Sequence, residues 1–325
     1  MFEGLLINIL ILLASIIVLS KSSDLTITNS VRVADITGLG KTTIGFILVA
    51  FSTSLPELLV SIFSMVNQET TGIAIGNVLG SNVVNVCLIL GVCFILATLK
   101  NSNQTNLLPL IVEEEIGNLH LGLFIASIVP LVLLYVRHIN QLIGGFLLAI
   151  FVYYSYQLSK TTSVRDEGAL GGERQKLGKY TLLTFLGAIG VTVTAYFIVD
   201  SASYVAENIG VPRIVIGATI IAFGTSIPEL ATSIDATKKG HLNLALGEIV
   251  GSCFINITCI LGVALVASPF NVDMTAFSNL VMLSIMSNLL LWYFLSSEKI
   301  TRREGLILLF MYFISLVMSF GGYRS

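Results

Sequence analysis

Residues 43–62 read TIGFILVAFSTSLPELLVSI, and residues 215–234 read VIGATIIAFGTSIPELATSI. The two stretches lie 172 positions apart and are identical at eleven of their twenty aligned positions. Each places a proline followed by a glutamate, Glu57 or Glu229, in the middle of an apolar run. An ionisable group inside a membrane segment is energetically costly and marks a functional site by default. The repeat therefore predicts one site built from two copies of a motif.

The composition around these stretches is that of a polytopic membrane protein. Of 325 residues, 55% are hydrophobic and 11% are charged, and the mean hydropathy is +0.92. A helix needs about 20 mainly apolar residues to cross a bilayer. Ten apolar stretches of suitable length are present and predict an all-α fold, at about 4–20, 41–66, 72–98, 119–136, 140–159, 180–200, 212–236, 242–268, 273–295 and 304–321.

The basic residues predict how these ten spans are oriented. No Lys or Arg precedes Lys21, so the first stretch is predicted to span the membrane rather than to be a cleaved signal. With both termini extracellular, 14 of the 17 basic residues fall on the cytoplasmic side of the plasma membrane, as the positive-inside rule requires. A basic loop rich in Ser and Thr is predicted over residues 21–40.

A second pair of similar segments follows the first pair. Residues 72–85 read GIAIGNVLGSNVVN, and residues 244–256 read LALGEIVGSCFIN. In each segment two glycines are four positions apart, a spacing that lets another helix backbone approach closely in a membrane. Each also carries a serine and an asparagine one turn apart on one helix face, Ser81 with Asn85 and Ser252 with Asn256.

The duplication divides the chain into two halves of five spans. We predict a first repeat over residues 1–159, a cytoplasmic linker over 160–179 that is rich in charge and Gly, and a second repeat over 180–325. Five is an odd number, so the second repeat enters the bilayer from the opposite side. Inverted repeats with a binding site near the midplane are typical of secondary transporters.

The motif offers oxygen atoms to a cation. A proline within a helix leaves the carbonyl four residues earlier without its hydrogen bond, and Pro56 would free the carbonyl of Ser52 in this way. Thr53 and Ser54 share a helix face with Glu57, and the second copy repeats this set as Thr225, Ser226 and Glu229. Hard cations such as Ca²⁺ and Na⁺ prefer carboxylate, carbonyl and hydroxyl oxygens.

Charge favours exchange of unlike ions. Glu57 and Glu229 together balance one divalent ion, or two monovalent ions or protons, so competition for one pair of charges is a physical basis for antiport. The alternative for a single copy is a proline kink that only serves packing, but two inverted copies favour a site. Glu248 and Asp235, which have no acidic counterpart in the first copy, are predicted to be vestibule groups near the cytoplasm, with direct ligation of the ion as the alternative.

At these motifs the chain resembles the cation/calcium exchanger superfamily, and within it the prokaryotic sodium/calcium exchangers. The matching segments are STSLPE with GNVLGSNVVN and GTSIPE with GEIVGSCFIN. The resemblance implies alternating access, in which two gating spans slide against a core of eight helices that carries the site. Asn256 differs from relatives that have Asp at this position, and the proton/calcium branch typically carries GNxxE instead of TSxPE.

The resemblance also implies a ligand set. Glu57 and Glu229 would bind both ions, with backbone carbonyls near Thr53 and Thr225. Asn85 matches a family site residue, and Asn256 occupies the equivalent position in the second copy. Flanking Na⁺ positions would draw oxygens from Ala50, Ser54, Ser81, Ala222, Ser226 and Ser252.

The sequence therefore predicts a secondary antiporter that exchanges Ca²⁺ for Na⁺. An H⁺/Ca²⁺ antiporter is the alternative within the same class, and a cation channel is the alternative from another class. We expect no enzymatic activity, because the spans contain no GxGD, HExxH or Ser/His pair. We also expect no cofactor, no nucleic acid and no obligatory protein partner, with the lipid bilayer as the surrounding phase.

Overall fold

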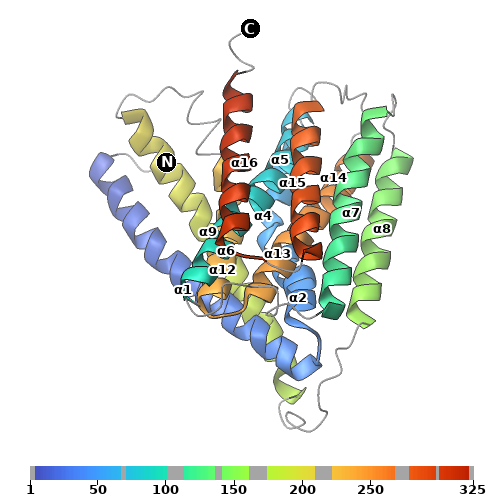
Figure 1. Ribbon diagram of the computed structural model, residues 1–325. Coiled ribbons are helices and arrows are strands. Elements are labelled where there is room, and N and C mark those ends of the chain that lie inside the picture. Colours follow the sequence, from blue (N-terminus) through green and yellow to red (C-terminus); the bar gives the residue numbers. More distant parts are fainter. Residues whose placement is uncertain are drawn as a thin grey trace.

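The computed structural model describes residues 4–66, 71–100, 113–135, 141–160, 174–208, 222–267, 278–297 and 300–321. These residues form helices and no strand (Figure 1). In the first half the helices are α1 Leu5–Thr37, α2 Lys41–Ile44, η1 Gly45–Val49, α3 Ala50–Thr53, α4 Leu55–Val66, α5 Thr71–Val83, η3 Val84–Ile89, α6 Leu90–Lys100, α7 Glu113–Tyr135 and α8 Gln141–Lys160. In the second half they are η5 Arg174–Lys176, α9 Leu177–Asn208, α11 Ala222–Gly224, α12 Ile227–Lys238, α13 Leu242–Ile255, η7 Asn256–Ile260, α14 Leu261–Ala267, α15 Ser278–Ser296 and α16 Arg302–Gly321.

The protein is an all-helical membrane protein. Helices occupy each of the ten predicted stretches, and seven helices of the described part are long and apolar enough to cross a membrane. Large apolar side chains project outward from the outer helices, including Leu6 on α1 at 70% exposed and Leu142 on α8 at 80%. Such a surface suits lipid tails rather than water.

The prediction of a loop over residues 21–40 is wrong for most of this segment. Helix α1 continues to Thr37 and ends where Gly38 adopts a left-handed backbone with φ 71°. The hydroxyls of Thr26 and Ser30 donate to carbonyls four residues earlier within the helix, at 2.9 and 2.8 Å. Because Ser and Thr can satisfy themselves on their own helix, a segment rich in them remains helical inside a protein.

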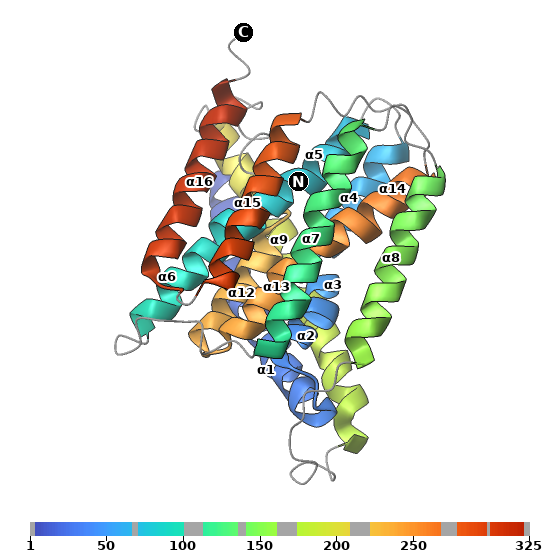
Figure 2. The ribbon, with the colours of Figure 1, turned by 45° about the vertical axis from the view of Figure 1, so that its right-hand side comes forward.

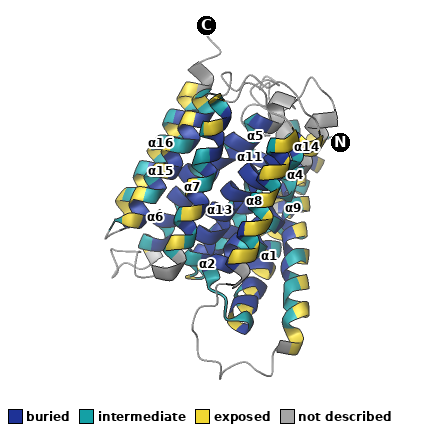
Figure 3. Cartoon of the chain, turned by 90° about the vertical axis from the view of Figure 1, so that its right-hand side faces the viewer, coloured by how far each residue is buried: buried dark blue, intermediate teal, exposed yellow. Residues whose placement is uncertain are grey.

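Helix α13 lies at the centre of the bundle and α1 at its edge. In the apolar stretch of α13 to α14, 83% of the residues are buried, against 12% in α1. Figure 3 shows the inner helices mostly dark blue and the outward faces yellow. Helix α13 contacts α2, η1 and α3, which carry the first motif copy, and α12, which carries part of the second.

Helices α1 and α9 form a long antiparallel pair. They pack against each other along most of their length and lie obliquely to the rest of the bundle (Figures 1 and 2). The pair also contacts the core, where α1 meets α12 and α9 meets α3 and α12. The predicted linker lies partly outside the described residues, and its end at Arg174–Lys179 is helical, within η5 and the start of α9.

Candidate cation site

The motif breaks its helix instead of kinking it. Helix α3 ends at Thr53, Ser54 forms a turn, and α4 begins at Leu55. Pro56 therefore lies in the first turn of a new helix, where a missing N–H costs nothing because that N–H has no helical partner. The prediction of a proline within a continuous helix is corrected in this respect.

The second copy has the same construction. Helix α11 ends at Gly224, Ser226 precedes α12 as its N-cap, and α12 carries its proline at the start. Glu57 and Glu229 both fall in the first turn of the new helix. A helix N-terminus presents unpaired N–H groups and the positive end of the helix dipole, so each half-helix stabilises its own carboxylate as an anion.

Glycines bring the first motif copy against the second half. An added Cβ on Gly251 would lie 2.6 Å from the carbonyl oxygen of Phe46, and one on Gly247 would overlap the carbonyl of Thr42. The predicted close approach is confirmed for this pair. For the first half an added Cβ on Gly80 meets nothing in the described part of the chain, and the segment that would be equivalent to 42–46, residues 214–218, lies outside it.

The close approach of α13 to the first motif helix places hydroxyls from both halves around Glu229. The Ser54 hydroxyl donates to Glu229 Oε1 at 3.2 Å and lies 2.9 Å from the Ser252 hydroxyl. The Ser252 hydroxyl is itself 3.5 Å from Glu229 Oε1, and Asn85 Nδ2 donates to it at 3.0 Å. Glu229, Ser54, Ser252 and Asn85 are all at most 2% exposed. Four predicted site residues thus share one hydrogen-bonded cluster.

Glu57 is buried close to this cluster. Its side chain is 1% exposed and lies near enough to Glu229 for the charge of Glu229 to act on it. The chain thereby places two carboxyl groups from different halves in one protein interior. Two carboxylates in such proximity repel each other unless a cation lies between them.

Several oxygens at the site have no hydrogen-bond partner among the described residues. Buried polar atoms in folded proteins are normally paired, so a group of unpaired acceptors requires an explanation. Carboxylate, amide and hydroxyl oxygens of this kind are the ligands that hard cations prefer. The unpaired oxygens are Glu57 Oε2, Glu229 Oε2, Asn85 Oδ1, Asn256 Oδ1, Ser81 Oγ and Ser226 Oγ.

The other predicted site residues are placed less directly. The Thr53 hydroxyl donates to the carbonyl of Val49 at 3.1 Å, and the Thr225 hydroxyl donates to Asn77 Oδ1 at 3.3 Å. Both threonine hydroxyls therefore donate to other oxygens. Their lone pairs and their backbone carbonyls remain available to an ion. Ala50 is fully buried in α3, while Ala222 begins α11 and its side chain lies outside the described part.

Two buried residues near the site were not predicted to belong to it. Asn82 is fully buried, and its Oδ1 accepts a hydrogen bond from Asn256 Nδ2 at 3.2 Å. Glu248, predicted as a vestibule group near the cytoplasm, is also fully buried. Its replacement of the Asn77 found in the first copy was the available signal. Asp235 is partly exposed and pairs with Lys239 at 2.8 Å.

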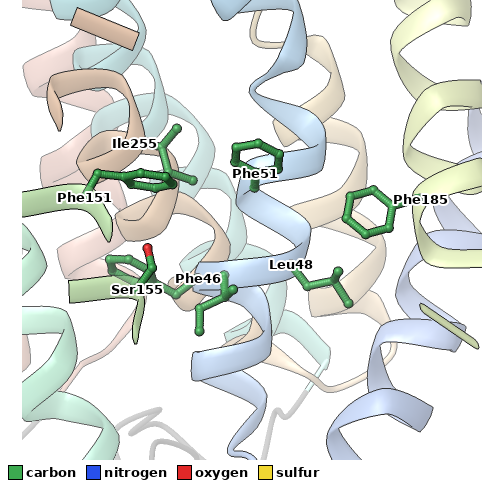
Figure 4. A pocket seen from close by; sticks show the side chains of 8 residues that line it. Phe46, Leu48, Phe51, Phe151, Ser155, Phe185 and Ile255 are labelled. Carbon is green, nitrogen blue, oxygen red and sulfur yellow. The ribbon is translucent and has the colours of Figure 1, made fainter. Parts of the chain in front are cut away.

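A separate cavity of about 220 Å³ has no cation chemistry. It lies between α8, α9 and the first motif helix, and its lining is almost wholly apolar (Figure 4). Phe51 and Phe151 stack across it with ring centroids 6.4 Å apart. Ser155 supplies the one hydroxyl among its lining residues. The carboxylates and the cavity are therefore distinct features of the interior.

Comparison with known proteins gives one consistent family. The profile described as sodium/calcium exchanger protein matches residues 7–159 and 179–321. The chain is 30% identical to the sodium/calcium exchanger MaX1 of Methanosarcina acetivorans, over 97% of this chain and 99% of that protein. It is 31% identical to the inner membrane protein YrbG of Escherichia coli, over 78% of this chain and 79% of the relative.

A solved structure has the same fold. The sodium-calcium exchanger NCX_Mj, soaked with 10 mM Na⁺ and no Ca²⁺, superposes with a TM-score of 0.83 at 27% sequence identity. The superposition covers 97% of this chain and 99% of the other. The similarity therefore extends over both halves and is not limited to the motifs.

Proposed function

This chain belongs to the sodium/calcium exchanger protein family, and we propose that it exchanges Ca²⁺ for Na⁺ across the plasma membrane at the site formed by Glu57 and Glu229. The observation that carries the site assignment is the pair of buried carboxyl groups, each with an oxygen that has no hydrogen-bond partner among the residues that the structure describes. The two groups come from different halves of the chain, so a bound ion would be held by both halves at once.

Charge balance explains why the two ions would compete. One Ca²⁺ neutralises both carboxylates, and so do two Na⁺ ions, whereas an empty site leaves two like charges buried together. The empty site is therefore the costly state, and a protein in that state does not readily cross between its two conformations. Movement then requires one cargo or the other, which couples the two fluxes.

The ligands divide into a central set and a flanking set. We assign Ca²⁺ to Glu57 and Glu229 with backbone carbonyls near Thr53 and Thr225, because a divalent ion needs both charges. Hydroxyl, amide and carbonyl oxygens around this centre would hold Na⁺, which needs less charge. The flanking set is Ala50, Ser54, Ser81, Asn85, Ala222, Ser226, Ser252 and Asn256.

Helices α1 and α9 are the elements suited to move. They pack chiefly against each other and touch the core over a smaller area, and the core of remaining helices carries both carboxylates (Figure 1). Sliding of this pair past the core would open the site to one side and close it to the other. Such motion agrees with the ten-span arrangement as two inverted five-helix repeats, residues 1–159 and 180–325 joined by a cytoplasmic linker.

Orientation follows from the basic residues. With ten spans and the positive-inside rule, both termini are extracellular and the turn around Lys239 is cytoplasmic. The start of α1 and the end of α16 lie at the same end of the bundle in Figure 1, as an even number of spans requires. Net transport of Ca²⁺ would be outward when Na⁺ enters down its gradient.

Uptake of radioactive calcium into proteoliposomes tests the function. We expect uptake when Na⁺ is loaded inside and diluted outside, and we expect a protonophore to leave it unchanged. Uptake that depends on a pH gradient alone would identify an H⁺/Ca²⁺ antiporter instead. Calcium entry that needs no countertransported ion would identify a channel.

A further inference from the structure

Glu248 is a third carboxyl group buried in the protein, outside the pair already assigned. It is fully buried on α13, and its Oε2 accepts a hydrogen bond from Ser233 at 2.9 Å. Its Oε1 is in contact with the hydroxyl of Thr232. These partners are neutral hydroxyls, so they orient the carboxyl group without balancing a negative charge. A buried charge normally has a counter-ion.

The position of Glu248 follows from the two helices that carry the central site. On α13, Glu248 precedes Ser252 by four residues, which is one helical turn on the same face. On α12, Thr232 and Ser233 follow Glu229 by three and four residues. Because α12 and α13 run in opposite directions, both steps lead toward the turn between them. Glu248 therefore lies about 5 Å beyond the central site, on the side of that turn.

More oxygen groups line the same route. Thr53 is a neighbour of both Glu229 and Glu248. Thr237 follows Ser233 by one turn on the same face of α12 and is 2% exposed. Its hydroxyl lies against the thiol of Cys93 and has no oxygen or nitrogen partner among the described residues. Polar side chains thus recur at each helical turn of α12 from Glu229 to Thr237, with Glu248 beside them on α13.

The opposite side of the site lacks this charge. The counterpart of Glu248 in the first repeat is Asn77, and the counterpart of Thr53 is Thr225. The Thr225 hydroxyl donates a hydrogen bond to Asn77 Oδ1 at 3.3 Å, and both of these side chains are neutral. The equivalent position on the other route therefore carries an amide in place of a carboxyl group.

We propose that Glu248, with the hydroxyls of Thr232 and Ser233, forms an additional Na⁺ position on the side of the 239–241 turn. One carboxylate balances one monovalent cation, and hydroxyl oxygens complete a site for a small hard ion. A Na⁺ ion moving between the central site and the 239–241 turn would bind here on its way. Since Asn77 stands at the equivalent place on the other route, the position exists on one side of the membrane alone.

This inference rests on the proposed function, and its test uses vesicles of known sidedness. The measured quantity is the Na⁺ concentration that half-activates calcium exchange, determined with Na⁺ varied first on one face and then on the other. For Glu248→Gln we expect this concentration to rise about tenfold on the face of the 239–241 turn, which corresponds to about 1.4 kcal/mol. On the opposite face we expect a change of less than about twofold, within about 0.4 kcal/mol.

Two further variants separate ion binding from a structural role. Glu248→Asp retains the charge and should restore most of the Na⁺ affinity, whereas a purely structural role would make the shorter side chain as harmful as glutamine. Asn77→Glu adds the charge to the other route and should lower the half-activating Na⁺ concentration on that face only. Asn77→Glu also serves as the test if Glu248→Gln does not fold.

Equal shifts on both faces, or none on either, would overturn the additional Na⁺ position. If Glu248 carries a proton instead of Na⁺, the Na⁺ dependence of Glu248→Gln stays the same on both faces, which also overturns it. In these cases calcium exchange itself continues. Failure of the proposed function is a different result, in which the wild-type protein takes up calcium without an outward Na⁺ gradient.

Discussion

The hydroxyl oxygens of Ser54 and Ser252 lie 2.9 Å apart, although 198 positions separate the residues in the chain. Ser54 comes from the break in the first motif helix and Ser252 from the glycine-rich helix of the second half. Both hydroxyls also contact the same carboxylate oxygen, Oε1 of Glu229. The site is therefore assembled across the two halves.

The shared hydrogen bonds predict that the contributions of Ser54 and Ser252 to calcium affinity are not additive. Ser54→Ala and Ser252→Ala should each weaken calcium binding, and the double variant should differ from the sum by about 0.5–3 kcal/mol, as is usual for residues in one network. Isothermal titration of purified protein with Ca²⁺ gives the three affinities. Ser52→Ala is the matched control, because the Ser52 hydroxyl donates to the carbonyl of Leu48 and to no site residue in the described contacts. Additive effects of the two site variants would contradict the shared cluster.

Removal of either central carboxylate should abolish transport. Glu57→Gln or Glu229→Gln leaves one charge to hold a divalent ion, at a cost of about 3 kcal/mol or more. Calcium uptake should therefore fall to about a hundredth of the wild-type rate or less. Size-exclusion chromatography should show an unchanged, folded protein. Asp35→Asn removes an exposed carboxylate on α1 and should transport normally; a Glu57 or Glu229 variant that matches it would refute the site assignment.

The close approach of Gly251 to the backbone of Phe46 predicts that one added methyl group strongly destabilises the protein. In Gly251→Ala the added Cβ would press on the backbone of Phe46, which cannot move aside as a side chain would. We expect a loss of about 3 kcal/mol or more in the free energy of unfolding, seen as a lower melting temperature in detergent. Gly145→Ala on α8 is the control, since its Cβ meets no described atom within 4 Å. A Gly251 variant as stable as this control would contradict the close approach.

The ion pairs of Lys239 predict how the contact between α1 and α12 depends on pH. Its Nζ lies 2.5 Å from Asp24 on α1 and 2.8 Å from Asp235 on α12. Burial lowers the pKa of Lys239, but the hydrogen bonds and charges of the two aspartates outweigh burial and hold this pKa above its usual value. The stabilisation is thus fully present below about pH 10.4, the pKa of an unfolded lysine, and disappears as the pH rises through the higher folded pKa.

Thermal unfolding of Lys239→Gln beside the wild type measures this contribution. The variant should be less stable by at most about 1 kcal/mol, because the pair is partly solvated. The difference should be constant from about pH 6 to pH 9 and should close only above about pH 10.4. Lys21→Gln, which removes an exposed lysine on α1, should match the wild type throughout. A difference that closes near neutral pH would assign the effect to another group.

Residues that repeat were predictable from the sequence, and residues that depend on a partner were not. Glu57 and Glu229 were recognisable because the same costly pair of residues occurs twice in apolar surroundings. Asn82 stands beside the predicted Ser81, yet its importance depends on a hydrogen bond to Asn256 from the other half. No spacing rule within one segment reveals such a contact.

The extent of α1 shows a second limit of sequence reasoning. Polar residues after Lys21 suggested a loop, since Ser and Thr favour turns in water. In the protein their hydroxyls bond to the helix that carries them, and the antiparallel packing against α9 covers one side. Helix α1 therefore runs to Gly38, the first residue of the segment that takes a left-handed backbone.

The contact of residues 42–46 with Gly247 and Gly251 makes the two motif copies depend on each other. The backbone of the first motif helix touches α13 at positions where a single methyl group would not fit. The two glycines therefore set how far the oxygens of the first motif copy lie from Ser252 and Glu229, so any change at this contact alters the stability of the fold and the affinity for ions together.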